Sequence, residues 1–323
     1  MKLLSLRVWS ELDAAERARI HARSTHTIFE PGLVAAIERI YADVAARGDA
    51  AVADATRTFD KADVSPDELL VPPAAIAAAH ASLDPALLDA IRVAIRQVRA
   101  FNEAQLAAMP AWRREIAPGI VVGEVHRPIP SAGLFVPCGK GSFPSVLVMI
   151  GVPAVVAGVP EITVIVPPMP GTAEVDPAVL ATAHELGITR VLRANGPAGV
   201  AAVVTGTERI AKVSKVVGPG SPAVTIAQVL GQTRGVATNM LCGPSESLII
   251  ADDSADPVRL AADLLNEAEH GPDSAAILVT DSRALAEAVD AEAAKQIADL
   301  PEQRAAYARS SVTVLGEIGR AHV

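Results

Sequence analysis

The chain has 323 residues, of which half are hydrophobic and only 3% aromatic, and its formal net charge is −9. This composition allows a sizeable core and excludes a disordered protein. It also argues against a nucleic-acid partner, because phosphate backbones bind clustered Lys and Arg and the chain has no basic run. The length allows two domains, or one domain inserted into another.

The first third of the chain is predicted to be helical. Residues 1–28 form a separate N-terminal segment and make a poor signal peptide, because Trp9 and acidic residues interrupt the short apolar patch. From residue 29 to about residue 102, apolar residues recur at spacings of three and four, which predicts amphipathic helices. Residues 110–130 alternate and then meet prolines, a pattern typical of an extended crossing into a new domain.

From residue 132 onward, strands and helices alternate. The predicted strands include GLFVP, EITVIVPP, RVLRA and KVSKVVGPG, and one helix between them stops at Gly187. This rhythm predicts βαβ units and a parallel sheet covered on both faces. The fold class is therefore α/β, with two Rossmann-like lobes of parallel sheets flanked by helices. One lobe, 132–242, is inserted into the other, which comprises 29–131 plus 243–323 and is incomplete at its C-terminus.

Neither a membrane location nor an oxidising compartment is predicted. The most apolar stretch, 146–168, is divided by Pro153 and Pro160 into a helix, a turn and a strand, which argues against a membrane span. Cys138 and Cys242 are the only cysteines. Two thiols in a reducing cytoplasm are favoured, and a single disulfide is the alternative.

The last residues depart from the strand–helix rhythm. SVTVLG is a predicted strand that should lead into another helix, but the chain stops at EIGRAHV. We expect the natural protein to continue, and residues 318–323 to be translated sequencing adapter, because a widely used adapter string can encode IGRAHV. His322 is accordingly given no functional weight.

The stretch NEAEHGPDS follows an apolar-periodic run and ends at a Gly-Pro stop. On a helix, Glu267 and His270 are three residues apart and share one face, so both could reach one divalent metal ion. Both are ordinary zinc ligands, although two ligands do not complete a zinc site. The alternative is a plain helix end, where the dipole favours His270 in the last turn and Glu267 pairs with it at the surface.

Three loops contain further candidate residues. In VGPGS, the glycines and Ser221 imitate a dinucleotide fingerprint, but the acidic residue expected about twenty positions later is not evident, and a plain turn is the alternative. The loop CGKGS does not have the P-loop order, which argues against an ATPase. In CGPSES, the Ser245 hydroxyl could face a cleft, and turn structure is the alternative reading.

Taken together, RGDAAVADATRTFDK, GLFVP, GTERIAKVSKVVGPG, CGPSES and EAEHGPDS resemble histidinol dehydrogenase in order and spacing, from about residue 26 to residue 316. The resemblance implies a zinc-dependent, NAD-linked enzyme of histidine biosynthesis that oxidises the amino alcohol L-histidinol to L-histidine. It implies a homodimer with a shared active site. It also implies that His270 and Glu267 bind the metal and the substrate, and that Ser245 contacts the substrate.

The sequence departs from the family pattern at several positions. Glu267 stands where the family usually has a glutamine ligand, and Phe135, Ala198 and Ser221 occupy cofactor-contact positions that are usually tyrosine, glutamine and asparagine. We expect weaker NAD binding or a changed cofactor, since each lost hydrogen bond is worth about 0.5–1.5 kcal/mol. The family's catalytic Glu-His pair and remaining metal ligands lie beyond the end of the chain, so we expect this polypeptide not to turn over.

The leading hypothesis is a truncated, divergent member of the histidinol dehydrogenase family that acts on L-histidinol. One alternative is a paralogue that acts on another small polar alcohol, which Glu267 and the altered cofactor positions favour. A second is a non-catalytic paralogue that kept the fold and lost the cofactor. A phosphate-binding enzyme without redox chemistry, built on the GPGS and CGKGS loops, is the most distant.

Overall fold

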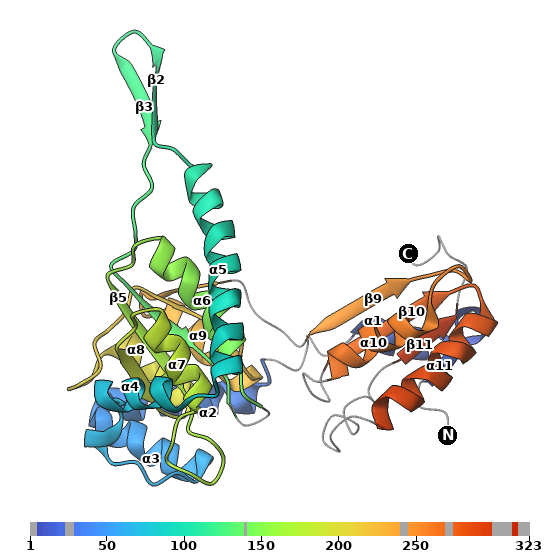
Figure 1. Ribbon diagram of the computed structural model, residues 1–323, viewed down its shortest axis with the longest axis horizontal. Coiled ribbons are helices and arrows are strands. Elements are labelled where there is room, and N and C mark those ends of the chain that lie inside the picture. The colour runs from blue at the N-terminus through green and yellow to red at the C-terminus, as the bar shows by residue number, and fades with distance from the viewer. Residues whose placement is uncertain are drawn as a thin grey trace. The chain divides into compact units, whose positions relative to one another are not determined.

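The computed structural model describes residues 5–22, 29–138, 141–239, 245–268, 274–298 and 312–315. The chain divides into two compact units (Figure 1). Unit 1 comprises Met1–Ile28 and Gly243–Val323, and unit 2 comprises Phe29–Cys242. Each unit contains a parallel sheet with helices packed against it.

The sheet of unit 2 has five parallel strands in the order β6-β5-β4-β7-β8. The strands are β4 (Ser131–Phe135), β5 (Glu161–Val166), β6 (Arg190–Arg193), β7 (Lys215–Val217) and β8 (Ala237–Thr238). The helices between them are α6 (Pro144–Val156), α7 (Pro177–Glu185), α8 (Gly196–Thr205) and α9 (Pro222–Gln232). The predicted alternation of strands and helices is therefore confirmed, as is the division of 146–168 into a helix and a strand.

Local signals fix the ends of these helices. At the start of α7, the Asp176 side chain accepts a hydrogen bond from the Ala178 amide at 2.8 Å, as an N-cap does. At its end, Gly187 has φ of +70°. The amides of Gly187 and Ile188 donate to the carbonyls of His184 and Ala183 at 3.0 and 2.8 Å. This pairing is the Schellman motif, and it confirms the helix stop predicted at Gly187.

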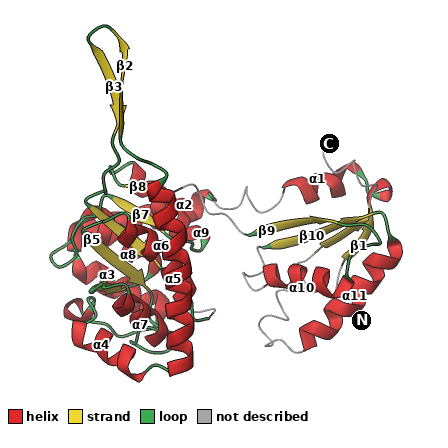
Figure 2. Ribbon diagram, turned by 45° about the horizontal axis from the view of Figure 1, so that its top comes forward, coloured by secondary structure: helices red, strands yellow, loops and turns green. Residues whose placement is uncertain are grey.

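Helices cover both faces of this sheet (Figure 2). On one face, β-strand side chains such as Phe135, Ile165 and Leu192 pack with residues of α2 (Pro31–Arg47), α3 (Asp49–Asp60), α8 and α9. On the other, side chains such as Leu134 and Val164 pack with residues of α4 (Pro73–Ser82), α5 (Pro85–Ala107), α6 and α7. Burial of both faces is what an all-parallel sheet requires.

The division into units differs from the predicted domains. Residues 29–131 were expected to belong with 243–323, whereas the structure groups them with 132–242. The reason is that the apolar stripes of α2–α5 bury themselves against the sheet of unit 2. Residues 1–28 are not a separate segment, because β1 (Ser5–Val8) adds a parallel strand to unit 1 by pairing with β11 (Val312–Leu315).

A β-hairpin projects from unit 2 between α5 and β4 (Figures 1 and 2). Its antiparallel strands are β2 (Trp112–Ala117) and β3 (Ile120–Glu124). Every residue of both strands is exposed, including large apolar side chains such as Ile116 and Val121. The extended structure predicted for 110–130 is present as a hairpin over 112–124, but it does not cross into a new domain, because both of its flanks belong to unit 2.

Unit 1 has a four-stranded parallel sheet in the order β1-β11-β10-β9. Its remaining strands are β9 (Glu246–Ile250) and β10 (Ala275–Thr280), and its helices are α1 (Ala14–Ala22), α10 (Pro257–Ala268) and α11 (Arg283–Ala298). Leu260 and Leu264 of α10, Leu278 of β10 and Val289 of α11 form its core. Residues 318–323 and Cys242 lie outside the described residues.

Among the described residues, no single helix is long and apolar enough to cross a membrane. Only α4 and α5 taken together pass that test of length and composition, and they are bent by 111° at their junction.

A substitution at Tyr41 tests how α2 packs against unit 2's sheet and α9. Its hydroxyl donates to the Ala227 carbonyl of α9 at 2.7 Å, and burial raises the pKa of that hydroxyl. We expect Tyr41→Phe to lower the free energy of unfolding at neutral pH by about 0.5–1.5 kcal/mol.

The same substitution should change the pH dependence of stability. The folded state favours the neutral phenol, so the wild type loses stability as the pH rises above about 10, the ordinary tyrosine pKa. Tyr41→Phe has no such group, so the difference in free energy of unfolding between the wild type and the variant should narrow above that pH. Urea unfolding at neutral and alkaline pH measures both effects, and a gap that widens with pH would contradict them.

Candidate functional site

In unit 1, two predicted site residues come to the same edge of the sheet. Ser245 immediately precedes β9, and its carbonyl accepts a hydrogen bond from the Ala275 amide of β10 at 3.1 Å. Helix α10 follows β9 and packs back across β9 and β10. Its C-terminal turn, which contains Glu267, therefore returns to the edge where these parallel strands begin.

Glu267 lies on the side of α10 that faces the sheet. It follows the buried Leu260 and Leu264 at the helical spacing of four and then three residues. Its Oε2 atom is buried and has no hydrogen-bond partner among the described residues. A buried carboxylate oxygen costs free energy unless a cation or a hydrogen-bond donor satisfies it. A buried oxygen without a protein partner is therefore what we expect of a metal ligand at this position.

The rest of the predicted metal site is not described. His270, the second predicted ligand, lies outside the described residues, as do Gly243 and Pro244 next to Ser245. Within the ranges that the structure describes, no group of three or more His, Cys, Asp and Glu side chains could hold a metal ion. The donor chemistry of Glu267 nevertheless fits zinc, which takes carboxylate oxygens alongside imidazole nitrogens.

In unit 2, the carboxyl edge of the sheet has a topological switch point. The chain proceeds from β4 to β5 and β6 on one side, and later from β7 to β8 on the other. The loops that follow β4 and β7 therefore diverge at this edge, where doubly wound proteins bind their ligands. The loop after β7 is held in place by Gln228 of α9, whose Nε2 donates to the Gly218 carbonyl at 2.9 Å.

The three predicted cofactor-contact residues all lie at this edge. Phe135 ends β4, Ala198 is in the first turn of α8, and Ser221 immediately precedes α9. Phe135 is 2% exposed and Ala198 is 0% exposed, whereas Ser221 is exposed. The Phe135 ring packs so closely that a Cβ on Gly196 or Gly220 would lie only 3.3 or 3.1 Å from it. Of the three, only Ser221 presents a polar group at the surface.

A polar network that the sequence did not reveal holds the loop between β6 and α8. The Asn195 amide donates to Thr56 Oγ1 at 2.9 Å, and Asn195 Nδ2 donates to Asp60 Oδ2 at 3.0 Å. Burial raises the pKa of Asp60, and the hydrogen bond from Asn195 opposes this effect. Helix α3 thereby positions the segment against which Phe135 packs. Thr56 and Asp60 are four residues apart on α3, but helix spacing alone does not identify their partner.

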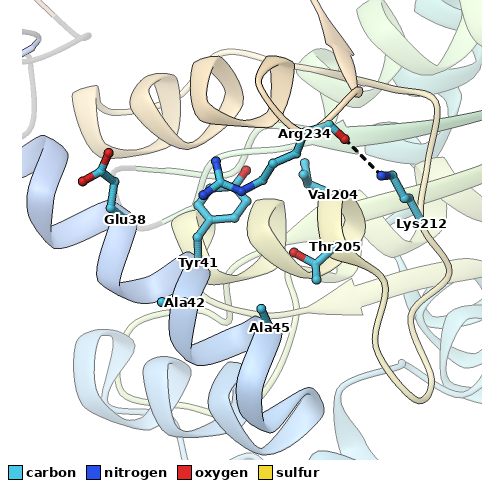
Figure 3. A pocket seen from close by; sticks show the side chains of 8 residues that line it. All are labelled: Glu38, Tyr41, Ala42, Ala45, Val204, Thr205, Lys212 and Arg234. Carbon is cyan, nitrogen blue, oxygen red and sulfur yellow. Dashed lines mark hydrogen bonds between the residues drawn. The ribbon is translucent and has the colours of Figure 1, made fainter.

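A hollow of about 310 Å³ lies elsewhere on unit 2, between α2, the end of α8 and the turn after α9 (Figure 3). The Arg234 guanidinium stacks over the Tyr41 ring, 4.2 Å from its centroid. Arg234 Nη1 donates to the Leu230 carbonyl at 2.8 Å, and Lys212 Nζ donates to the Arg234 carbonyl at 3.1 Å. Arg234 thus caps a carbonyl in the last turn of α9 and Lys212 holds the turn that follows, so both cations have structural roles.

Two parallel sheets with helices packed against them, one with a switch point, define a doubly wound α/β protein. The family described as histidinol dehydrogenase matches residues 24–320 of the chain. A histidinol dehydrogenase homolog from Rhizobium meliloti (strain 1021) is 41% identical over 310 residues, covering 96% of this chain and 67% of the relative. The histidinol dehydrogenase of Xanthomonas euvesicatoria pv. vesicatoria (strain 85-10) is 40% identical over 313 residues, covering 97% and 70%.

A solved structure agrees with these relatives. The crystal structure of histidinol dehydrogenase from Elizabethkingia anophelis matches with a TM-score of 0.87 at 31% identity, covering 98% of this chain and 71% of that one. The chain therefore belongs to the histidinol dehydrogenase family, a family of oxidoreductases, and the predicted fold class is confirmed. The residue roles in zinc, substrate and cofactor binding stay predictions.

A substitution at Gly218 tests how closely the loop after β7 approaches β4. A Cβ at this position would overlap the Phe135 carbonyl oxygen, whereas nothing lies within 4 Å of one at Gly158. Both glycines have positive φ, 131° and 75°. We expect Gly158→Ala to cost about 1–2 kcal/mol through its backbone conformation, and Gly218→Ala to cost about 1–3 kcal/mol more through overpacking. Urea unfolding compares them, and equal losses would contradict the close approach.

Proposed function

We propose that the chain is part of an enzyme that oxidises L-histidinol to L-histidine, and that it contributes binding of zinc and L-histidinol through unit 1 and of NAD through unit 2. Family membership supports the reaction. Glu267 is half-buried, and its buried Oε2 atom, which has no partner among the described residues, is the observation that supports the metal most directly. When bound, zinc would orient the amino alcohol as a Lewis acid, and two NAD molecules in turn would each accept one hydride, with water supplying the second carboxylate oxygen.

The residues of unit 1 have separate tasks in this proposal. Glu267 would supply an anionic oxygen ligand from the end of a rigid helix, and His270 a neutral nitrogen ligand. Ser245 would hydrogen-bond the polar substrate from the same edge of the sheet. The carboxylate places one more negative charge beside the metal than a neutral amide would, which favours retention of the cation and reduces its Lewis acidity.

The edge of unit 2 would hold the cofactor mainly through backbone groups. Ser221 precedes α9, where free backbone amides and the helix dipole favour phosphate. The burial of Phe135 and Ala198 leaves few side-chain donors there. The same observation favours a second candidate, a family member that acts on another small polar alcohol with weakened or altered cofactor binding. One relative is itself called a histidinol dehydrogenase homolog.

A second copy of this chain is the proposed partner. The hairpin is a two-stranded sheet with exposed apolar side chains, which is at best marginally stable in water without a covering surface. Its strands carry two arginines and two glutamates, so the hairpin has no net charge and its exposed apolar side chains are what support this partner. We propose a homodimer in which each hairpin packs on the other copy.

Replacing Glu267 tests the proposed metal site. Glu267→Ala should weaken zinc binding by about 100-fold, because an anionic ligand on a rigid helix is removed. Asp263→Ala, which removes an exposed carboxylate of the same helix, is the matched control and should bind zinc like the wild type. Competition with a chromophoric chelator measures both, and histidinol binding should follow zinc occupancy. Unchanged zinc affinity in Glu267→Ala would overturn the proposed metal site.

Ser221 tests the proposed cofactor edge. Ser221→Asn restores the amide that the family resemblance implies, so it should strengthen NAD binding by about two- to tenfold, the value of one hydrogen bond. Thr233→Asn introduces the same side chain at the exposed opposite end of α9 and should leave the affinity unchanged. Isothermal titration with NAD measures the three affinities. Equal effects of the two substitutions would count against binding at this edge.

Ile120 tests the proposed partner. It is 54% exposed on β3, so Ile120→Lys should leave the fold intact and weaken self-association by about tenfold or more. Phe59→Lys is the control, because Phe59 is 60% exposed on α3. Sedimentation equilibrium gives the dissociation constants. A monomeric wild type, or an Ile120→Lys protein that associates like the wild type, would refute the hairpin interface.

A further inference from the structure

Ser247 in β9 has a hydroxyl with no role in the structure described so far. Its Oγ atom is buried and has no hydrogen-bond partner among the described residues. In the described part of unit 1, the other buried side-chain atoms without a partner are Glu267 Oε2 and Arg17 Nε, of which only Glu267 Oε2 is an oxygen. Buried polar atoms normally have partners, so two such oxygens in one small unit need a common explanation.

The Ser247 side chain faces the layer between the sheet and α10. Alternate residues of a strand share a face, and Ile249, two residues further along β9, packs against the core that α10 and α11 form on the sheet. Ser247 also pairs in register with Ala276, a fully buried member of that core. Ser247 is therefore the polar residue in the row of β9 that points toward α10.

Glu267 enters the same layer from the helix side. It continues the buried stripe of Leu260 and Leu264 by one turn, toward the edge where β9 begins. Ser247 lies near that edge, as the second residue of β9. The Ser247 hydroxyl thus enters the space between the sheet and α10 from the sheet, and the Glu267 carboxylate enters it from the helix. Both lie near the same edge of the sheet, and no hydrogen bond joins them.

A divalent cation would satisfy both oxygens. An ionised carboxylate only accepts hydrogen bonds, whereas a hydroxyl can donate one or offer its lone pairs to a cation. A buried carboxylate oxygen without a partner is costly, and a bound cation removes that cost. We propose that Ser247 is a further residue of the Glu267 site and that its oxygen faces the same divalent cation. This inference rests on the metal site of the proposed function and adds a residue to it.

A thiol in place of the hydroxyl tests the direction in which Ser247 points. Thiolates bind cobalt(II), a common substitute for zinc, and give a charge-transfer absorption band in the near ultraviolet. Titrated with Co²⁺ under reducing conditions, Ser247→Cys should show such a band beyond that of the wild type. Ser254→Cys is the control, because Ser254 lies in an exposed turn of the same unit. A Ser247→Cys spectrum equal to that of the wild type would overturn the inference.

Ser247→Ala provides an independent readout. Loss of the hydroxyl should weaken zinc binding by about tenfold, the effect of removing a group that supports a metal ligand. The melting temperature in the presence of a chelator should not fall, because the substitution removes a buried polar atom that has no partner. Wild-type zinc affinity in Ser247→Ala contradicts the role of Ser247.

Glu267→Ala separates this inference from the proposed function. If Glu267→Ala loses zinc and both Ser247 variants bind the metal as the wild type does, the Ser247 assignment fails and the metal site stands. If the wild-type chain binds neither Zn²⁺ nor Co²⁺, both fail. If the Ser247 and Glu267 variants are both affected and the Ser254 variant is not, the two residues share one site.

Discussion

A parallel sheet has to be covered on both faces, and this requirement organises the larger unit of the protein. The strands of unit 2 carry apolar side chains on alternate sides, and helices from two regions of the chain bury them. Helices α6–α9 come from the alternating βα segment, and α2–α5 come from the preceding residues. The carboxyl edge of the sheet, with its switch point, owes its shape to this packing. It is the edge at which we propose that the cofactor binds.

The same need for burial makes the Glu267 carboxylate informative. Helix α10 presents an apolar stripe to the smaller sheet, and Glu267 continues that stripe where another Leu would have packed. An acidic residue at such a position costs stability unless something with positive charge satisfies it. Family membership gives this carboxylate a chemical context, and the unpartnered Ser247 hydroxyl in the same layer extends it. One bound cation would explain why both oxygens lack a hydrogen-bond partner among the described residues.

Local sequence patterns predicted the helices and strands well. They could not predict which sheet each helix covers or which residues meet across the fold, because tertiary packing determines both. The βα alternation after residue 132 and the helix stop at Gly187 depend on residues that are neighbours in sequence, so both could be predicted from the sequence alone. The apolar stripes of α2–α5 show that a face is buried but not which sheet covers it, and the predicted domain division differed for that reason. Motif positions brought Phe135, Ala198 and Ser221 to one edge, but the burial of Phe135 depends on Gly196 and Gly220, which are distant in sequence. His270 lies outside the described residues, and its role stays a prediction.

The central claim is that Glu267 is an oxygen ligand of a bound zinc ion. Zinc X-ray absorption spectroscopy on the metal-loaded chain and on Glu267→Ala tests it most directly. We expect a first shell of nitrogen and oxygen only, at about 2.0–2.2 Å in the wild type, with a lower coordination by protein oxygen in the variant. A sulfur shell at about 2.3 Å, which would point to Cys138 or Cys242, or identical spectra for the two proteins, would contradict it.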